Sequence, residues 1–239
     1  MSTLTLVRHG QASFFAADYD KLSGVGETQS RLLGAYWLGR GVSFDEVYTG
    51  PRSRQVETAA LAGEAFARAG LPWPRPVVLE ELDEHAVDRL IKGSLPEISQ
   101  AFPHIVPLAE TYARAESDAD KHRGFQRLFE AVMILWASGE CGAEGVETWR
   151  AFGVRVRAGL ARITGRAGRG RRVVAFTSVG VITVALRTSL ELGDRKALDL
   201  GWRLRNGSIT EFLFTKDRLT LDGFNAFPHL EDPALWTYR

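Results

Sequence analysis

Four side chains in this 239-residue chain have the types that phosphate chemistry needs: Arg8, His9, Arg54 and Glu81. A neutral imidazole is a competent nucleophile toward phosphorus near neutral pH, because its ordinary pKa is about 6.5. Guanidinium groups bind phosphate oxygens in bidentate fashion, and a carboxylic acid can protonate the departing oxygen. Together these residue types predict phosphoryl transfer through a phosphohistidine at His9, with no metal required.

Each of these groups is expected at or just beyond the carboxyl end of a strand. Short β-compatible runs are found at residues 4–7, 44–48, 77–79 and 172–176. In open α/β sheets, ligands bind beyond the carboxyl ends of the strands, so side chains that are distant along the chain can converge on one site. A fourth polar loop, Thr177 to Gly180, follows the last of these strands and is expected at the same edge.

The alternation of strands with helices predicts an α/β fold in three layers, with a mostly parallel sheet and helices on both of its faces. Helical spacing of apolar residues is found at 26–38 and 181–192. Residues 208–214 and 218–221 are typical of a terminal hairpin. We predict a single domain, 1–239, that contains a mostly helical insertion at about 83–145.

Composition narrows the function classes. The chain is 45% hydrophobic and 25% charged with a net charge of +1, so no overall field points to nucleic acid or to a membrane surface. Its start lacks the features of a signal peptide, no apolar run reaches a membrane span, and Cys141 is the single cysteine. These features predict a cytoplasmic protein whose partner is a small phosphate ester. A basic stretch at 162–172 could grip a polyanion, but a solvated loop is the favoured interpretation.

Each candidate also has a structural interpretation. A single histidine after a strand is more often structural than catalytic, and Arg54 could be a surface residue even though a cation in the first turn of a helix is disfavoured by the helix dipole. Glu81 taken alone would be a solvated carboxylate. The residue types and their spacing therefore predict an anion site and leave its function open.

The motifs around these residues resemble those of the histidine phosphatase superfamily, which includes cofactor-dependent phosphoglycerate mutases and many phosphatases. The signature Leu-Val-Arg-His-Gly-Gln at 6–11 lies at the end of the first strand, close to the N-terminus. The similarity continues through several further segments, which are residues 22–29, 44–51, Arg54 with Thr58 and Ala59, 79–81 and 147–155.

The resemblance implies a phosphoglycerate mutase-like fold and a role for each candidate residue. His9 is then the residue that is phosphorylated, Arg8 and Arg54 clamp the phosphate, and Glu81 is the proton donor. Glu80 is a weaker candidate for the acid, because the spacing in the family points to the second glutamate. No cofactor and no bound metal are implied.

The sequence departs from the family at Ser178. Members of the family usually carry a second histidine there, which donates to the transferring phosphoryl group. A serine hydroxyl is shorter and uncharged, and the loss of one preorganised donor typically costs about 10²–10³ in rate. Ser178 could bind phosphate and partly compensate, or it could simply cap the following helix. His229 could enter the site instead, although a structural role suits that residue better.

Two functions follow from these residues. The first is a metal-independent phosphatase that acts on a phosphomonoester through His9, with a rate that the change to Ser178 could lower. The second is a protein on the same scaffold that binds a phosphorylated ligand without turning it over, because Ser178 replaces the second histidine.

Overall fold

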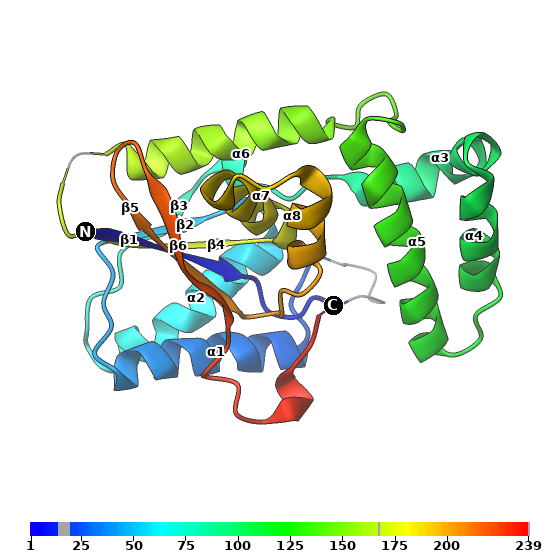
Figure 1. The fold of residues 1–239 in the computed structure, drawn as a ribbon. Helices are drawn as coiled ribbons and strands as arrows, with labels where there is room; N and C mark the ends of the chain where they lie inside the picture. Colours follow the sequence, from blue (N-terminus) through cyan, green and yellow to red (C-terminus); the bar gives the residue numbers. More distant parts are fainter. Residues whose placement is uncertain (14–19, 167, 239) are drawn as a thin grey trace. The chain divides into compact units, whose positions relative to one another are not determined.

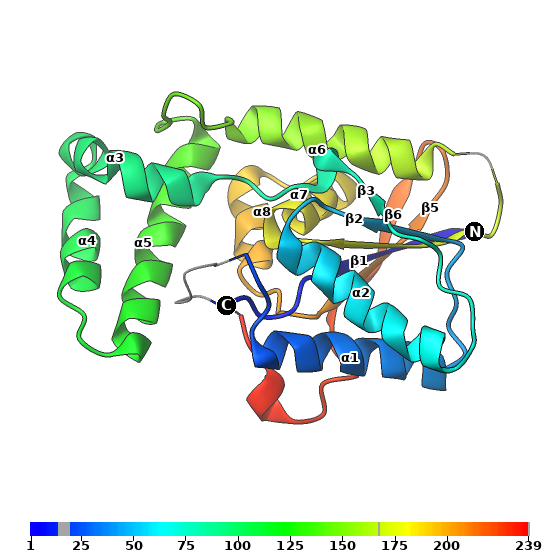
Figure 2. The same cartoon turned by 180° about the vertical axis from the view of Figure 1, so that it is seen from behind.

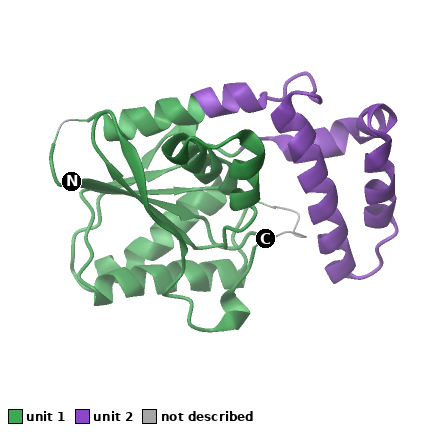
Figure 3. Ribbon diagram, viewed as in Figure 1, with its two compact units in different colours: residues 1–84, 155–239 green, residues 85–154 purple. Residues whose placement is uncertain are grey.

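The computed structural model describes residues 1–13, 20–166 and 168–238 of the chain (Figures 1 and 2). The chain divides into two compact units (Figure 3). Unit 1 comprises residues 1–84 and 155–239, and unit 2 comprises residues 85–154. The segment predicted as a helical insertion, 83–145, therefore overlaps most of unit 2.

Unit 1 is built on a six-stranded sheet with the order β3-β2-β4-β1-β5-β6. The first four strands in this order pair in parallel, and β5 and β6 add an antiparallel edge, which is the predicted hairpin. The mostly parallel sheet is thus confirmed. The strands are β1 (Ser2–Arg8), β2 (Glu46–Thr49), β3 (Val77–Val78), β4 (Arg172–Thr177), β5 (Ile209–Phe214) and β6 (Leu219–Ala226).

Helices cover both faces of this sheet, as the strand and helix alternation predicts. The helices α1 (Gly24–Gly39) and α2 (Ser53–Arg68) lie on one face, and α7 (Val179–Leu190) lies on the other with the later part of α6 (Trp149–Thr164) (Figures 1 and 2). A short helix, α8 (Asp194–Gly201), follows α7. No helix in the described residues is long and apolar enough to cross a membrane.

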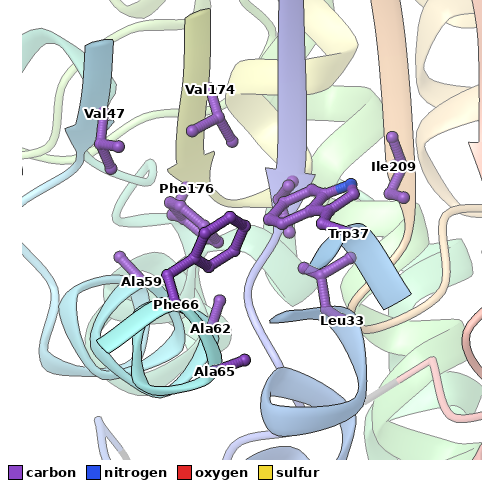
Figure 4. Packing of buried hydrophobic residues seen from close by; sticks show 11 residues of the cluster. Leu33, Trp37, Val47, Ala59, Ala62, Ala65, Phe66, Val174, Phe176 and Ile209 are labelled. Carbon is purple, nitrogen blue, oxygen red and sulfur yellow. The ribbon is translucent and has the colours of Figure 1, made fainter. Parts of the chain in front are cut away.

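A cluster of apolar side chains joins the sheet to α1 and α2 (Figure 4). Strands that are buried on both faces need apolar side chains on both, which explains the uninterrupted run Val173 to Phe176 in β4. Trp37 of α1 and Phe66 of α2 pack onto this face, and Trp37 meets Phe176 edge to face at 6.2 Å between ring centroids. The packing holds the carboxyl ends of the strands next to the start of α2.

The helices α1 and α2 approach closely at Gly34, where a Cβ atom would overlap the carbonyl oxygen of Ala62. Gly39, at the end of the same helix, has open space around the position of a Cβ. Gly34 is therefore required by packing, whereas Gly39 is not.

Gly34→Ala is expected to lower the free energy of unfolding by about 1–3 kcal/mol, because the added methyl group forces two backbones apart. Gly39→Ala, the matched control, is expected to be neutral or to stabilise the protein by up to about 1 kcal/mol through helix propensity. Urea unfolding followed by circular dichroism measures both changes. Equal stability of the two variants would contradict the close helix contact.

Unit 2 is helical and has its own aromatic cluster. Its elements are α3 (Val87–Ala101), η2 (Pro103–Ile105, a 3-10 helix), α4 (Val106–Ala113), α5 (Asp118–Ser138) and the first residues of α6. The indole of Trp136 lies 5.5 Å from Trp149 and 6.1 Å from Phe152, and the ring of His85 lies 5.3 Å from Trp136. Aromatic packing thus gives this unit its own core.

The basic stretch before β4 is partly buried rather than solvated throughout. Arg171 is 8% exposed, and its Nε donates to Glu46 Oε1 at 2.7 Å. Arg166 donates to the other oxygen of Glu46 at 2.9 Å. These two arginines anchor the start of β4 to β2.

Candidate active site

His9 lies at the end of β1, and its backbone fixes it against two neighbouring segments. The His9 amide donates to Thr177 O at 2.9 Å, and its carbonyl accepts from Asn206 Nδ2 at 3.3 Å. The Nδ1 atom of the ring is 2.7 Å from Gly10 O. Because a carbonyl oxygen only accepts, Nδ1 must carry the proton, and the lone pair is on Nε2. Nε2 is therefore the ring atom whose lone pair could attack phosphorus.

The surroundings of His9 keep its imidazole neutral. Burial lowers the pKa of His9 well below its usual range, and the positive charges of Arg54 and Arg8 lower it further. The hydrogen bond to Gly10 O opposes this shift but does not reverse it. A neutral ring is the form that can attack phosphorus.

Arg54 contacts the His9 ring directly. Its Nε donates to His9 Nε2 at 3.1 Å, and its Nη1 donates to Asp20 Oδ1 at 2.6 Å. The other oxygen of Asp20 accepts from the amide of Ser53 at 2.9 Å. Arg54 is thus held between the His9 ring and Asp20, with its guanidinium directed at Nε2.

Thr58 explains why a threonine follows the arginine by four residues. Its hydroxyl donates to Arg54 O at 2.6 Å and accepts from the amide of Gly10 at 3.0 Å. Gly10 in turn has no room for a Cβ, which would lie 2.5 Å from Gly26 O. The start of α2 and the loop after β1 are therefore joined next to His9.

The guanidinium of Arg8 contributes positive charge to the site, and its N–H groups donate to backbone carbonyl groups. Its Nη1 donates to Leu204 O at 2.5 Å, and its Nη2 donates to Tyr238 O. The positive charge of Arg8 contributes to the low pKa of His9. That Arg8 also clamps the phosphate stays a prediction.

Ser178 is fully buried and lies beside His9. Arg8 pairs with Thr177 in the parallel register of β1 and β4, so His9 and Ser178 are the next residues at the same edge of the sheet. Ser178 is the N-cap residue of α7, but its hydroxyl makes no capping hydrogen bond. The Ser178 Oγ atom instead accepts from Gln55 Nε2 at 2.8 Å. Ser178 thus has the N-cap position that the helix-cap interpretation predicts, but its side chain does not cap the helix.

Glu81 lies in η1 (Glu80–Leu82), a 3-10 helix that packs on α6. Its Oε1 accepts from Arg162 Nη1 at 3.1 Å, and a Cβ at Gly159 would meet its side chain. A hydrogen bond from its own backbone amide, together with Arg162, lowers the pKa of Glu81. A carboxyl group that is held ionised at neutral pH is a poor proton donor.

Glu84, which the sequence interpretation did not select, contacts the segment that follows Ser178. Its Oε2 accepts from the amide of Gly180 at 3.3 Å, at the start of α7. The neighbouring Asp83 pairs with Arg52 through both oxygens, at 2.5 and 3.2 Å. Burial opposes the charge of Arg52, but Asp83, with additional contributions from Asp20 and Glu84, raises the pKa of Arg52.

His229 packs as a structural residue. A Cβ at Gly207 would lie 3.4 Å from His229 Nε2, and the ring of Tyr36 lies 6.2 Å from the imidazole. Burial lowers the pKa of His229 to about 4, so its ring is neutral near neutral pH. Among the described residues, no hydrogen bond joins its ring to another group.

Two further positioning residues, Gln29 and Asn206, carried no sequence signal of their own. Gln29 Oε1 accepts from the amide of Gln11 at 2.8 Å, and Asn206 binds His9 O as described above. The one signal available in the sequence is the pair of glycines at 10 and 26, because neither position has room for a Cβ where the loop after β1 packs on α1.

In the part of the chain that the structure describes, no group of three or more His, Cys, Asp or Glu side chains could hold a metal ion.

Comparisons with known proteins show the family and the fold of this chain. A family model described as the histidine phosphatase superfamily (branch 1) matches residues 4–120 and 119–226. Among solved structures, a phosphoserine phosphatase from Entamoeba histolytica in complex with 3-phosphoglyceric acid is 18% identical, with 96% of this chain and 100% of that chain covered and a TM-score of 0.63.

Two other solved structures show the same fold. A phosphoglycerate mutase from Bacillus anthracis is 17% identical over 96% of this chain and 95% of its own, with a TM-score of 0.62. A mycobacterial glucosyl-3-phosphoglycerate phosphatase in complex with inorganic phosphate is 23% identical over 95% of this chain and 98% of its own, with a TM-score of 0.63. The predicted phosphoglycerate mutase-like fold is confirmed.

Proposed function

This chain belongs to the histidine phosphatase superfamily (branch 1), and from that premise we propose that it is a metal-independent phosphatase acting on a small phosphomonoester through a phosphohistidine at His9. The observation that carries this proposal is the state of His9. Its proton is on Nδ1, and its Nε2 lone pair faces Arg54 at 3.1 Å. A neutral nucleophile next to a phosphate-binding cation is what the first chemical step needs.

In that step, Nε2 attacks phosphorus in line, a P–N bond forms, and the P–O bond to the leaving group breaks. Arg54 gives up its hydrogen bond to Nε2 and binds the phosphoryl oxygens, helped by the charge of Arg8. The leaving oxygen takes a proton from a carboxylic acid. Water then attacks the phosphohistidine, the same carboxylate accepts a proton from that water, and inorganic phosphate leaves as His9 is restored.

The geometry favours Glu84 over Glu81 as this acid. Glu84 reaches the first turn of α7 next to Ser178, whereas the Glu81 carboxylate is paired with Arg162 on α6. Both carboxylates belong to the segment 81–84, so the choice of the acid rests on their different hydrogen-bond partners. The role first predicted for Glu81 stays a prediction, and we propose Glu84 in its place.

The substrate that we propose is a small phosphate ester in the cytoplasm. Structures of relatives in complex with 3-phosphoglyceric acid and with inorganic phosphate support a small phosphorylated ligand. A second candidate function is binding without turnover. It is favoured by Ser178, which is buried at the position where the resemblance to the family implies a second histidine.

Trapping the phosphoenzyme distinguishes the two functions. The protein is mixed with an aryl phosphate labelled in its phosphoryl group, in chelator, and quenched in alkaline detergent, which preserves phosphohistidine. We expect label on the peptide that contains His9. Because the pKa of His9 lies well below its usual range, labelling should persist at pH of about 5.5, where an ordinary histidine is mostly protonated.

Label on another residue would overturn the proposed mechanism. If no label and no hydrolysis appear, while inorganic phosphate still raises the melting temperature, the protein binds a phosphorylated ligand without turnover.

A further inference from the structure

Gln55 is a fully buried amide that links three segments of the site. Its Oε1 accepts from the backbone amide of Arg52 at 3.1 Å. Its Nε2 donates to Ser178 Oγ at 2.8 Å and, at the longer distance of 3.4 Å, to Leu82 O. One side chain of α2 thus binds the loop after β4 and the segment that leads to Glu84.

The orientation of this amide follows from its partners. The amide of Arg52 can only donate, and the carbonyl of Leu82 can only accept. Exchanging the oxygen and nitrogen of Gln55 would therefore place two donors face to face at Arg52 and two acceptors face to face at Leu82. Gly50 provides the space, because a Cβ there would overlap Gln55 Oε1 and lie 2.5 Å from Leu82 O. The Nε2 group must therefore face Ser178.

This orientation determines how Ser178 can act. Gln55 occupies an acceptor position on Oγ, which leaves the hydroxyl proton available for donation. Among the described residues, no group accepts a hydrogen bond from Ser178 Oγ. The Ser178 hydroxyl is buried beside His9, one register position beyond the pair of Arg8 and Thr177. Its unused proton can therefore be donated to a ligand oxygen bound next to His9.

We infer that Gln55 is a positioning residue that orients the Ser178 hydroxyl as a hydrogen-bond donor to the phosphoryl group transferred at His9. The inference rests on the proposed function, because it assigns Ser178 to the phosphoryl group of that site. The Gln55 and Ser178 pair would then supply, through a neutral donor, the contact that the missing second histidine would otherwise make.

A double-mutant cycle tests this coupling. The variants Gln55→Met, Ser178→Ala and the double variant are titrated with orthovanadate, an analogue of the transferring phosphoryl group, and with inorganic phosphate. Loss of one hydrogen bond to a charged oxygen predicts an orthovanadate affinity about 10- to 100-fold weaker for Ser178→Ala. Gln55→Met should weaken binding by about tenfold in the wild-type background and by less than about twofold when Ser178 is already alanine.

Gln126→Met is the matched control, because Gln126 of α5 in unit 2 donates to Glu130 and not to the site. It should leave orthovanadate affinity unchanged. Melting temperatures of all variants, measured without ligand, separate lost stability from lost coupling. For hydrolysis, the loss in Gln55→Met should fall on kcat rather than on KM.

The two proposals fail in different ways. Additive effects of Gln55→Met and Ser178→Ala on orthovanadate affinity would overturn the inference, even if hydrolysis through His9 is present. Coupled effects without any hydrolysis would support the inference and remove the phosphatase. Absence of orthovanadate and phosphate binding in every variant, wild type included, would overturn the inference as well.

Discussion

Replacing His9 by asparagine is expected to reduce kcat/KM for p-nitrophenyl phosphate by at least about 10³, because the nucleophile of the covalent step is lost. Asparagine is smaller than histidine; its amide nitrogen takes the position of Nδ1 and can still donate to Gly10 O, but the side chain does not reach the position of Nε2. The low pKa of His9 indicates that this buried ring is neutral in the folded protein, and asparagine is neutral too. The substitution therefore removes Nε2 and its lone pair without a change of charge. Steady-state hydrolysis in chelator measures the loss.

His104→Asn provides the control, because His104 is an exposed residue of η2 in unit 2. It should keep wild-type activity. Hydrolysis by His9→Asn at the wild-type rate would show that the phosphatase reaction does not pass through His9, and the site assignment would fall with it.

Glu84→Gln is expected to lower kcat for alkyl phosphates by about 10²–10⁴, the usual contribution of a general acid. Its effect on p-nitrophenyl phosphate should be smaller, because nitrophenolate leaves without needing a proton. Glutamine keeps the shape of the side chain and can still accept from the amide of Gly180. Initial rates with a series of esters that differ in leaving-group basicity measure the contrast.

Glu81→Gln is the comparison for this experiment. It breaks the ion pair with Arg162. The side chain of Arg162 is 61% exposed, so this ion pair contributes little to the stability of the protein. We expect activity close to wild type with every ester. The opposite pattern, with a loss that depends on the leaving group in Glu81→Gln alone, would restore the role first predicted for Glu81.

Most of the sheet and its active edge could be predicted, because these features depend on local patterns. The run at residues 4–7 is apolar throughout, and the Arg8-His9-Gly10 step ends it abruptly. Since parallel strands present their carboxyl ends at one edge, His9, Arg54 and Ser178 were expected together. The structure brings Arg54 to His9 and Ser178 to the neighbouring register position.

The choice between Glu81 and Glu84 could not be made from the pattern. Both are carboxylates in the same short segment, and the turn of η1 decides which one reaches α6 and which one reaches α7. That turn depends on Leu82, whose side chain is buried and whose carbonyl accepts from Thr177 Oγ1 at 3.0 Å. These contacts join residues 95 positions apart.

The sequence by itself thus determined the fold class and the convergence of His9 and Arg54 at one edge of the sheet, because strand ends and residue types are local properties. Only the tertiary structure decided that the Gln55 side chain binds the hydroxyl of Ser178. Gln55 and Ser178 are 123 positions apart, and neither residue is unusual in its own segment. Their hydrogen bond forms only because the fold brings α2 next to the loop after β4. No local sequence pattern encodes the distance between two side chains so far apart in the chain.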